Sequence, residues 1–303
     1  MFEQLNNNEQ GNVLALFAVA LGGLLLAVGL VIDGGHLFMT KSHLQKTANA
    51  AALSGAQEVP YSEVEVHTVV DRILLEHGET GSLDQVLIEP ESQIEVILSK
   101  DVPLFFAKLF GIETVPIKVN AVAAINPMGI AKDAVPLGID ETVELIYGQT
   151  YSLKVDAGDS ASGNFGVLAL DGPGAKLYED SLRDGFDEQL EVGDIVNTQT
   201  GNIAGPTRNA IDYRIANCPY PVGEYKHRDC SRVMLILVYQ PHEVTTNQMK
   251  SVKITGFAYF YVTDPMSSTD DSINGIFIKR TGTGFTGEGT PVNRGAYAVK
   301  LIE

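Results

Sequence analysis

The most distinctive pattern along the chain is an apolar segment near its N-terminus. Residues 13–32, VLALFAVALGGLLLAVGLVI, contain no charged side chain. As a helix rising about 1.5 Å per residue, this segment would be about 30 Å long, which is the thickness of the hydrocarbon core of a bilayer. A helix in the core of a soluble domain is usually apolar on one face rather than on every side. The pattern therefore predicts one membrane-spanning helix.

The residues before this segment indicate whether it is a cleavable signal peptide or a permanent anchor. Residues 1–12 contain Glu3 and Glu9 and neither Lys nor Arg. A cleavable signal peptide has a basic start and a shorter apolar run than this one. We therefore expect the helix to remain as an anchor, and no second hydrophobic span follows it in the sequence.

The helical pattern continues beyond the apolar segment. Residues 36–53 contain no helix breaker, and Pro60 gives the first clear stop signal. Leu44 and Ala48 belong to a loose apolar stripe along this part. We expect one helix of about 40 residues, half in the membrane and half emerging from it, with a kink at Gly34-Gly35. Residues 1–58 are assigned to this membrane and assembly helix.

Small residues recur at helical spacing along the same segment. The first line of them comprises Gly11, Ala15, Ala18, Gly22 and Gly29, and a second comprises Ala20, Ala27 and Gly34. Small side chains let membrane helices approach closely, although Gly and Ala are also simply frequent in such helices. We take the first line as a candidate helix-packing surface. Asp33 joins it, either as an interfacial stop that accepts hydrogen bonds or as a packing contact in an assembly.

Residues 60–127 predict a small α+β domain. The sequence 62–78, SEVEVHTVVDRILLEHG, has helical spacing of apolar positions, and residues 85–98 alternate as strands do. Residues 102–110 predict a short helix ended by Gly111, and residues 114–125 predict a strand rich in Val and Ile.

Residues 132–303 have a different pattern. Short β-type runs alternate with Gly, Asp, Asn and Pro, and turns are indicated at DGPG and TGTG. This predicts a mainly antiparallel β domain, a sandwich or a barrel, with a helical interruption near residues 175–185. The last strand either pairs inside this domain or offers an edge. The fold class of the whole chain is therefore α+β.

The charge of the chain excludes one class of partner and leaves another open. The net charge is −17, from 21 Lys and Arg against 38 Asp and Glu. Nucleic acid and anionic lipid headgroups both call for clustered basic residues, so we expect neither as a partner. An acidic surface indicates solubility, with calcium binding as the alternative. Carboxylates are dense over residues 179–194 but lack EF-hand spacing, so we expect no cofactor.

The flanking charges and the cysteines give opposite indications of orientation. Lys41 and Lys46 follow the apolar segment, and the positive-inside rule would place the large domain inside. Cys218 and Cys230 flank a short Pro-containing loop, which predicts a disulfide in an oxidising exterior. Two free thiols, or a metal site that includes His227, are the alternatives. Because the N-terminal tail is short and acidic, we favour the cysteines and expect the large domain on the extracellular side.

Few motifs point to catalysis. A GxGxxG string at residues 282–287 lies in a β-rich region and predicts a turn, since a dinucleotide site needs a strand before it and a helix after it. Ser160 and Ser162 lie in GDSASG, which is not a GxSxG elbow. The six histidines are scattered. We therefore expect no catalytic or metal residues and no enzyme, with an exported hydrolase as the least favoured alternative.

The N-terminal segment has a family resemblance. The string GNVLALFAVALGGLLLAVGLVIDGGHLFMTKSHLQKTANAAALSGAQEV resembles the N-terminal segment of TadG-like proteins of the tight-adherence (Flp) pilus assembly group. The matching parts are Gly11 before the apolar run, Asp33 with the Gly-Gly after it, and LQKTANAAALSGA. Residues 96–125 resemble this group more weakly.

Two features of the group are not carried over. Many TadG-like proteins have a von Willebrand A-type domain with an Asp-x-Ser-x-Ser metal motif, whereas the nearest string here, residues 159–163, has Ala161 and Gly163 in place of the two serines. Cleavage by a prepilin peptidase after Gly11 would put Leu16 where pilin-like relatives have Glu. The resemblance implies an anchored assembly component and no chemistry.

These observations lead to one hypothesis and its alternatives. We expect a membrane-anchored, exported envelope protein that acts in pilus or surface-filament assembly. Its partners would be the membrane, other envelope or assembly proteins bound through the N-terminal helix, and further copies of itself. The alternatives are that the chain is itself the filament subunit, or an extracellular ligand- or carbohydrate-binding module on an anchor.

Overall fold

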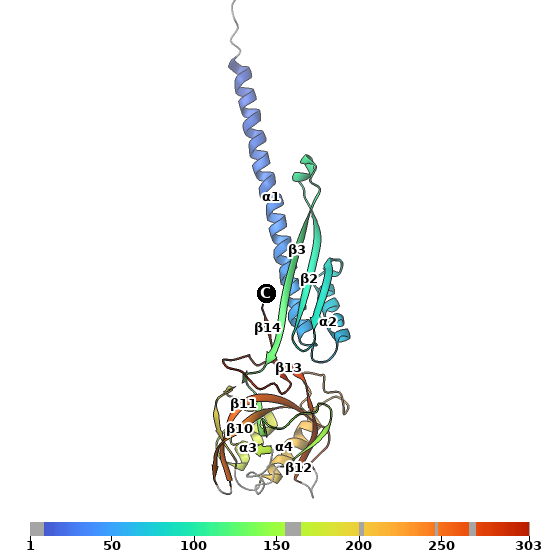
Figure 1. Cartoon of the computed structure of the whole chain (residues 1–303). Coiled ribbons are helices and arrows are strands. Elements are labelled where there is room, and N and C mark those ends of the chain that lie inside the picture. The colour runs from blue at the N-terminus through green and yellow to red at the C-terminus, as the bar shows by residue number, and fades with distance from the viewer. Residues whose placement is uncertain (1–8, 155–164, 200–202, 246–247, 267–270, 303) are drawn as a thin grey trace, which may run out of the picture.

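A single long helix dominates the N-terminal part of the chain (Figure 1). The computed structural model describes residues 9–154, 165–199, 203–245, 248–266 and 271–302. Helix α1 (Glu9–Ala56) has 48 residues and runs through Gly34-Gly35 without a break, so the predicted helix is confirmed and the predicted kink is absent. Within residues 13–32 every position except Gly29 is exposed, as expected of a helix that is apolar on all sides.

The C-terminal half of α1 is instead part of a folded core. Its fully buried positions, mostly alanines that allow a close approach to the sheet, are Leu44, Ala48, Ala51, Ala52 and Ala56. Helix α2 (Glu63–Glu76) begins at Ser62, whose hydroxyl accepts a hydrogen bond from the Val64 N–H at 3.1 Å. Its buried face packs on α1 in the same core. The helix predicted over residues 62–78 is thus confirmed.

The sheet beneath these helices has five strands. In spatial order they are β1 (Leu83–Glu89), β2 (Gln93–Pro103), β3 (Thr114–Pro127), β14 (Ala296–Leu301) and β13 (Arg280–Gly282). A one-turn 3₁₀ helix, η1 (Thr80–Ser82), leads from α2 into β1. The pairs β1–β2, β2–β3 and β3–β14 are antiparallel, whereas β13 and β14 run parallel.

The last strand lies in a different place from the one its sequence position suggests. The sequence assigns it to the β-rich region 132–303, yet β14 pairs with β3 of the first sheet, with Val299 opposite Ile125. Tyr297 is 1% exposed and belongs to the core formed by α1, α2 and this sheet. Strand β3 is long and apolar, and β14 covers the edge that it would otherwise expose.

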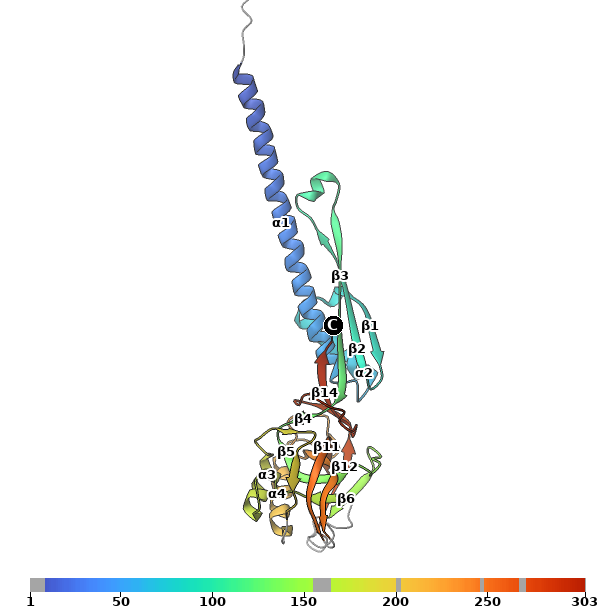
Figure 2. The ribbon, with the colours of Figure 1, turned by 60° about the vertical axis from the view of Figure 1, so that its left-hand side comes forward.

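The hairpin of β2 and β3 extends well beyond the rest of the first sheet. Both views show its end beside the exposed half of α1 (Figures 1 and 2). Here β2 continues to Pro103, and a short 3₁₀ helix, η2 (Ala107–Phe110), ends at Gly111 with φ 86°. The predicted helix of residues 102–110 is therefore correct only in its last turn. We call residues 104–112 the hairpin tip.

The second sheet forms the other end of the molecule (Figure 2). Its strands, in spatial order, are β6 (Thr150–Lys154), β12 (Ser272–Ile278), β11 (Gln248–Val262), β10 (Val233–Thr245), β5 (Ala134–Asp140) and β7 (Phe165–Val167), with β9 (Ile195–Asn197) also paired to β11. A separate small pair is formed by β4 (Ile130–Ala131) and β8 (Leu190–Glu191). Only β5–β10 is parallel among the described pairs of this sheet, and the described strands do not close into a barrel.

Two helices cover one face of this sheet. Helix α3 (Ala175–Asp184) is the helix predicted near residues 175–185. Helix α4 (Ala204–Asn217) was not predicted, because it has few apolar positions and carries Pro206 in its first turn, where proline is tolerated. Its buried Arg214 donates to the carbonyls of Leu182 at 2.6 Å and Ser231 at 2.9 Å. The chain is thus mixed α+β with a β-rich second part.

Candidate membrane-proximal site

The residue that joins the exposed half of α1 to the folded part of the chain is Asp33. Its carboxylate accepts hydrogen bonds from three successive backbone N–H groups of the hairpin tip: Phe105 at 2.8 Å, Phe106 at 3.0 Å and Ala107 at 2.7 Å. The side chain is buried, at 5% exposure. Asp33 thus accepts hydrogen bonds within one chain. Its place at a membrane interface and a packing role in an assembly stay predictions.

The local backbone explains why this acid is needed. The first N–H groups of a helix have no carbonyl acceptor inside the helix, and the three N–H groups lie just before and at the start of η2, whose N-cap is Phe106 and whose first residue is Ala107. A carboxylate usually caps such groups from the preceding residue, whereas here it comes from a helix more than 70 positions earlier in the chain. Asp33 therefore fixes the tip to one level of α1.

A second contact lies one turn closer to the N-terminus of α1. Gly29 is buried against the side chain of Phe106, and a Cβ added to Gly29 would lie 2.7 Å from Cγ of that ring. A real Cβ does not approach so closely, so the ring occupies space that only glycine leaves open.

Between the tip and α1 runs an apolar groove of about 800 Å³. Residues from the helix line one side and residues from the tip line the other: Gly22, Leu25, Leu26, Gly29, Leu30, Asp33, Gly34, Leu37, Leu104, Phe106, Ala107, Leu109, Phe110 and Ile112. Asp33 is the only charged residue among them, and its carboxylate is already engaged by the tip. The groove can thus accept an apolar ligand and offers little to a polar one.

The outer surface of the tip is also apolar. Its exposed apolar side chains are Phe105 at 60%, Leu109 at 79%, Phe110 at 68% and Ile112 at 52%, and Lys108 is exposed among them. Such a cluster on a loop is unusual for a protein surface in water and marks a contact site. The signal was present in the sequence as PLFFAKLFGI, but only the structure brings it beside the apolar helix.

The predicted helix-packing residues divide into two groups. Gly22, Gly29 and Asp33 are brought to the groove or the tip. Ala15 and Ala18 lie on the part of α1 that is exposed beyond the tip, and Gly11 lies in the first turns of the helix. Packing between helices of different chains stays a prediction for the second group.

A buried ionic cluster lies at the junction of α1, α2 and β2. Glu79 accepts hydrogen bonds from Lys100 Nζ at 2.7 and 2.8 Å and from the Ser82 hydroxyl, and His43 Nε2 lies 3.6 Å from its carboxylate. Burial of Glu79 opposes its ionisation, but these donors outweigh burial and lower its pKa below the ordinary value. The charged pair ties β2 to the turn after α2.

The two cysteines form a bond that closes a loop between the two sheets. Cys218 follows α4 and is joined to Cys230 in a disulfide, as the sequence predicts. Buried Arg280, on β13, donates to the carbonyls of Tyr225 at 2.8 Å and His227 at 3.1 Å. Lys226 lies 3.4 Å from Glu65 of α2. The loop therefore contacts both parts of the molecule, and His227 is held in it without metal-ligand partners among the described residues.

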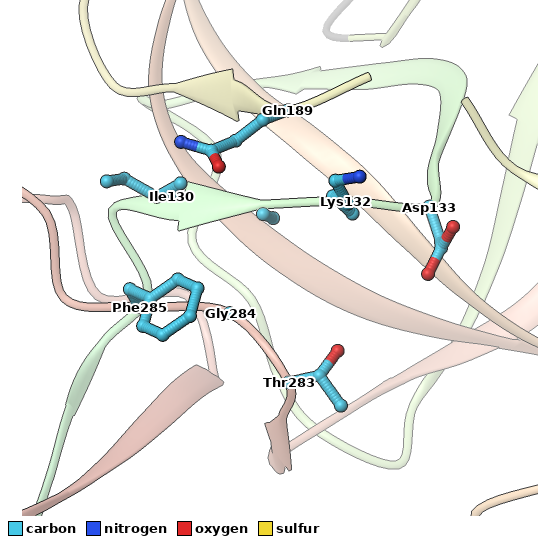
Figure 3. A pocket seen from close by; sticks show the side chains of 8 residues that line it. Ile130, Lys132, Asp133, Gln189, Thr283, Gly284 and Phe285 are labelled. Atoms are coloured by element: carbon cyan, nitrogen blue, oxygen red, sulfur yellow. The ribbon is translucent and has the colours of Figure 1, made fainter. Parts of the chain in front are cut away.

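The pocket in Figure 3 is lined by three residues of the GxGxxG string, Thr283, Gly284 and Phe285. It lies between the segment of Ile130 to Asp133 and the segment of Thr283 to Phe285 (Figure 3). Gln189 is the remaining lining residue. The two segments are joined by a β-bridge between Ile130 and Phe285, and the described residues after the string form β14 and no helix, so the string lacks the strand-to-helix setting of a dinucleotide site. At about 220 Å³ the pocket is smaller than sites that usually hold organic ligands.

Two segments of the sequence, 179–194 and 159–163, were considered as candidate metal-binding sites. Within the described residues, no three His, Cys, Asp or Glu side chains come together in a way that could hold a metal ion. In the acidic segment 179–194, Asp180 and Asp184 pair with Lys176 and Arg183 respectively. Ser160, Ser162 and the string 159–163 lie outside the described residues.

The described part of the chain contains one helix that is long and apolar enough to span a membrane, beginning at Val13. Neither a curated protein nor a solved structure matches the chain. Residues 11–58 match the family model "Putative Flp pilus-assembly TadE/G-like". The resemblance drawn from Gly11, Asp33 and residues 44–56 is thus confirmed, and α1 of this chain carries a TadE/G-like segment of the Flp pilus-assembly type.

Proposed function

We propose that this chain is a membrane-anchored envelope protein of a Flp-type pilus assembly. In this proposal residues 13–32 of α1 are the anchor, the rest of the chain folds on the outer side of the membrane, and the protein acts by binding rather than by catalysis. The match of residues 11–58 to a pilus-assembly family supports the assembly role.

The observation that carries the proposal is the division of α1 into two halves. From Val13 to Ile32 the helix is apolar and, except at Gly29, exposed, which in water would cost roughly 25 cal/mol per Å² of apolar surface. From Leu44 onward one face of the helix is buried in a core with α2 and the first sheet. One rigid helix therefore connects a lipid-compatible segment to a folded domain without a linker.

The outward orientation is supported by the chemistry of the folded part. A disulfide between Cys218 and Cys230 persists in oxidising compartments and is rare in the cytosol. The net charge of −17 suits an exported, soluble domain and gives no basic surface for nucleic acid. The assembly partners would be envelope proteins that contact α1 or the folded domain.

Extraction of membranes at alkaline pH tests the anchor. The full chain should stay in the membrane pellet, because a spanning helix is not released by loss of electrostatic contacts. A chain of residues 36–303, which keeps the positions of α1 that are buried in the core with α2 and the first sheet, should appear in the soluble fraction. Release of the full chain at alkaline pH would contradict the proposal.

A second candidate is that the chain is itself a subunit of the filament. It is favoured by the exposed apolar surface of α1 beyond the hairpin tip, which includes Ala15 and Ala18 and could pack against other copies. Electron microscopy of the labelled surface fraction separates the two: a subunit labels filaments along their length, whereas an assembly component stays with the membrane. The alternative of a ligand- or carbohydrate-binding module has less support, because the pocket of the folded part described above is small.

A further inference from the structure

We infer that the hairpin tip, residues 104–112, is a second membrane-inserting element, and that the groove between it and α1 holds lipid acyl chains. The tip would enter the leaflet on the side of the folded domain. The inference rests on the proposed function, since it requires α1 to span the bilayer, and it adds a contact that the anchor alone does not provide.

The depth of the tip follows from its contacts with α1. Phe106 packs on Gly29, which lies three positions inside the end of the apolar segment at Ile32. At the helical rise this is about 5 Å into the hydrocarbon region. The groove extends along α1 to Gly22, about 15 Å from the same end. A bilayer around residues 13–32 would therefore surround the tip as well.

The side chains of the tip are of the kind that suits a location in the hydrocarbon region of the bilayer. Three phenylalanines, two leucines and one isoleucine fall within residues 104–112, and the outward-facing ones are more than half exposed. Lys108 is the single charged residue there, and a lysine on a long apolar stem can reach the headgroups from a shallow depth. The charged residues resume at once on both strands, with Asp101 on β2 and Glu113 next to β3.

The backbone of the tip meets the condition that lipid imposes. Non-helical backbone is stable in hydrocarbon only where its polar groups are bonded internally. Leu104 donates to Glu113 at 2.9 Å, and Gly111 and Ile112 donate to carbonyls within the tip. Three N–H groups just before and at the start of η2 have no acceptor within the turn. They donate their hydrogen bonds to the carboxylate of Asp33 instead. In water these groups would need no such acceptor.

The groove favours lipid over a protein partner. It is continuous with the surface of α1 that lipid contacts, and its lining offers no free polar side chain to orient a peptide. A flexible acyl chain needs only apolar walls.

Depth-dependent fluorescence quenching of the full chain in liposomes tests this. A bimane label is attached, without reductant, at Leu109→Cys on the tip, at Leu16→Cys on α1, and at Val244→Cys on β10, each in a separate protein. These three positions are exposed, at 79%, 74% and 59%, so the labels should not disturb packing. The quenchers are lipids with nitroxide-labelled acyl chains, and iodide in the aqueous phase.

We expect the nitroxide lipids to quench the labels at positions 109 and 16 strongly and the label at 244 hardly at all. Iodide should quench the label at 244 strongly and the labels at 109 and 16 hardly at all. Iodide quenching at 109 with lipid quenching at 16 would overturn the inference while leaving the anchor intact. Protection of 109 from both quenchers would overturn it in favour of a protein that covers the tip. Absence of lipid quenching at 16 would overturn the anchor and this inference together.

Discussion

Gly29 of α1 lies directly beneath the ring of Phe106, with room for a hydrogen atom but not for a methyl group. We expect Gly29→Ala to weaken the docking of the tip by about 1–3 kcal/mol, the usual cost of overpacking a close contact. Spin labels on α1 and the tip, at Val19→Cys and Leu109→Cys, should then show a broader distance distribution. Gly23→Ala is the matched control, because nothing lies within 4 Å of a Cβ there; an equal broadening in the control would show that helix composition, not the contact, matters.

Asp33 holds the tip by charge-assisted hydrogen bonds, each worth about 1.5–3 kcal/mol and not additive. Asp33→Ala should therefore accelerate hydrogen exchange of the Phe105, Phe106 and Ala107 amides, whereas Asp33→Asn, which keeps one acceptor oxygen, should have a smaller effect. Asp101→Ala, an exposed carboxylate on β2, is the control. Unchanged exchange in Asp33→Ala would mean that the three bonds do not hold the tip.

The helices illustrate which elements of the fold could be predicted from the sequence and which could not. The length and uniform apolarity of residues 13–32 determine a helix regardless of context, and α2 follows from its apolar spacing and its cap at Ser62. Helix α4 depends on tertiary contacts, since Arg214 finds its acceptors on α3 and on the segment before β10, which no local pattern reveals.

The candidate site was predictable only in part. Asp33 stands out from the sequence as the first charge after the apolar segment, and Gly29 belongs to the line of small residues. Their partners, Phe105 to Ala107, lie more than 70 positions away, and a pairing over that separation depends on how far the β2–β3 hairpin extends past the sheet. The last strand was expected to pair inside the β-rich region or to offer an edge, and no local pattern indicates its pairing with β3.

Glu79 should make the stability of the first sheet depend on pH. Its pKa is lowered in the folded chain, so its contribution is present above the unfolded pKa, near 4.5, and is lost as pH falls through the folded value. We expect the melting temperature of the full chain in micelles to fall below about pH 4.5, and to fall less steeply in Glu79→Gln. Glu76→Gln, at an exposed position, serves as the control and should keep the acid-side slope of the parent.

The disulfide should stabilise the loop that joins the two parts of the molecule. Replacing both cysteines, Cys218→Ser with Cys230→Ser, removes a short covalent loop and should cost about 3 kcal/mol in the chain-entropy description. Thermal unfolding of parent and double variant, with and without reductant, measures this. Reductant should lower the stability of the parent alone; an equal effect on both would indicate that it acts elsewhere.

The central claim is that residues 13–32 cross the membrane and that the folded part lies outside the cell. Protease treatment of right-side-out membrane vesicles, which carry the full chain with an epitope after residue 303, tests it most directly. We predict that protease removes the epitope without permeabilisation, while the apolar half of α1 stays in the membrane pellet. An epitope that survives until detergent opens the vesicles would contradict the account and place the folded part inside.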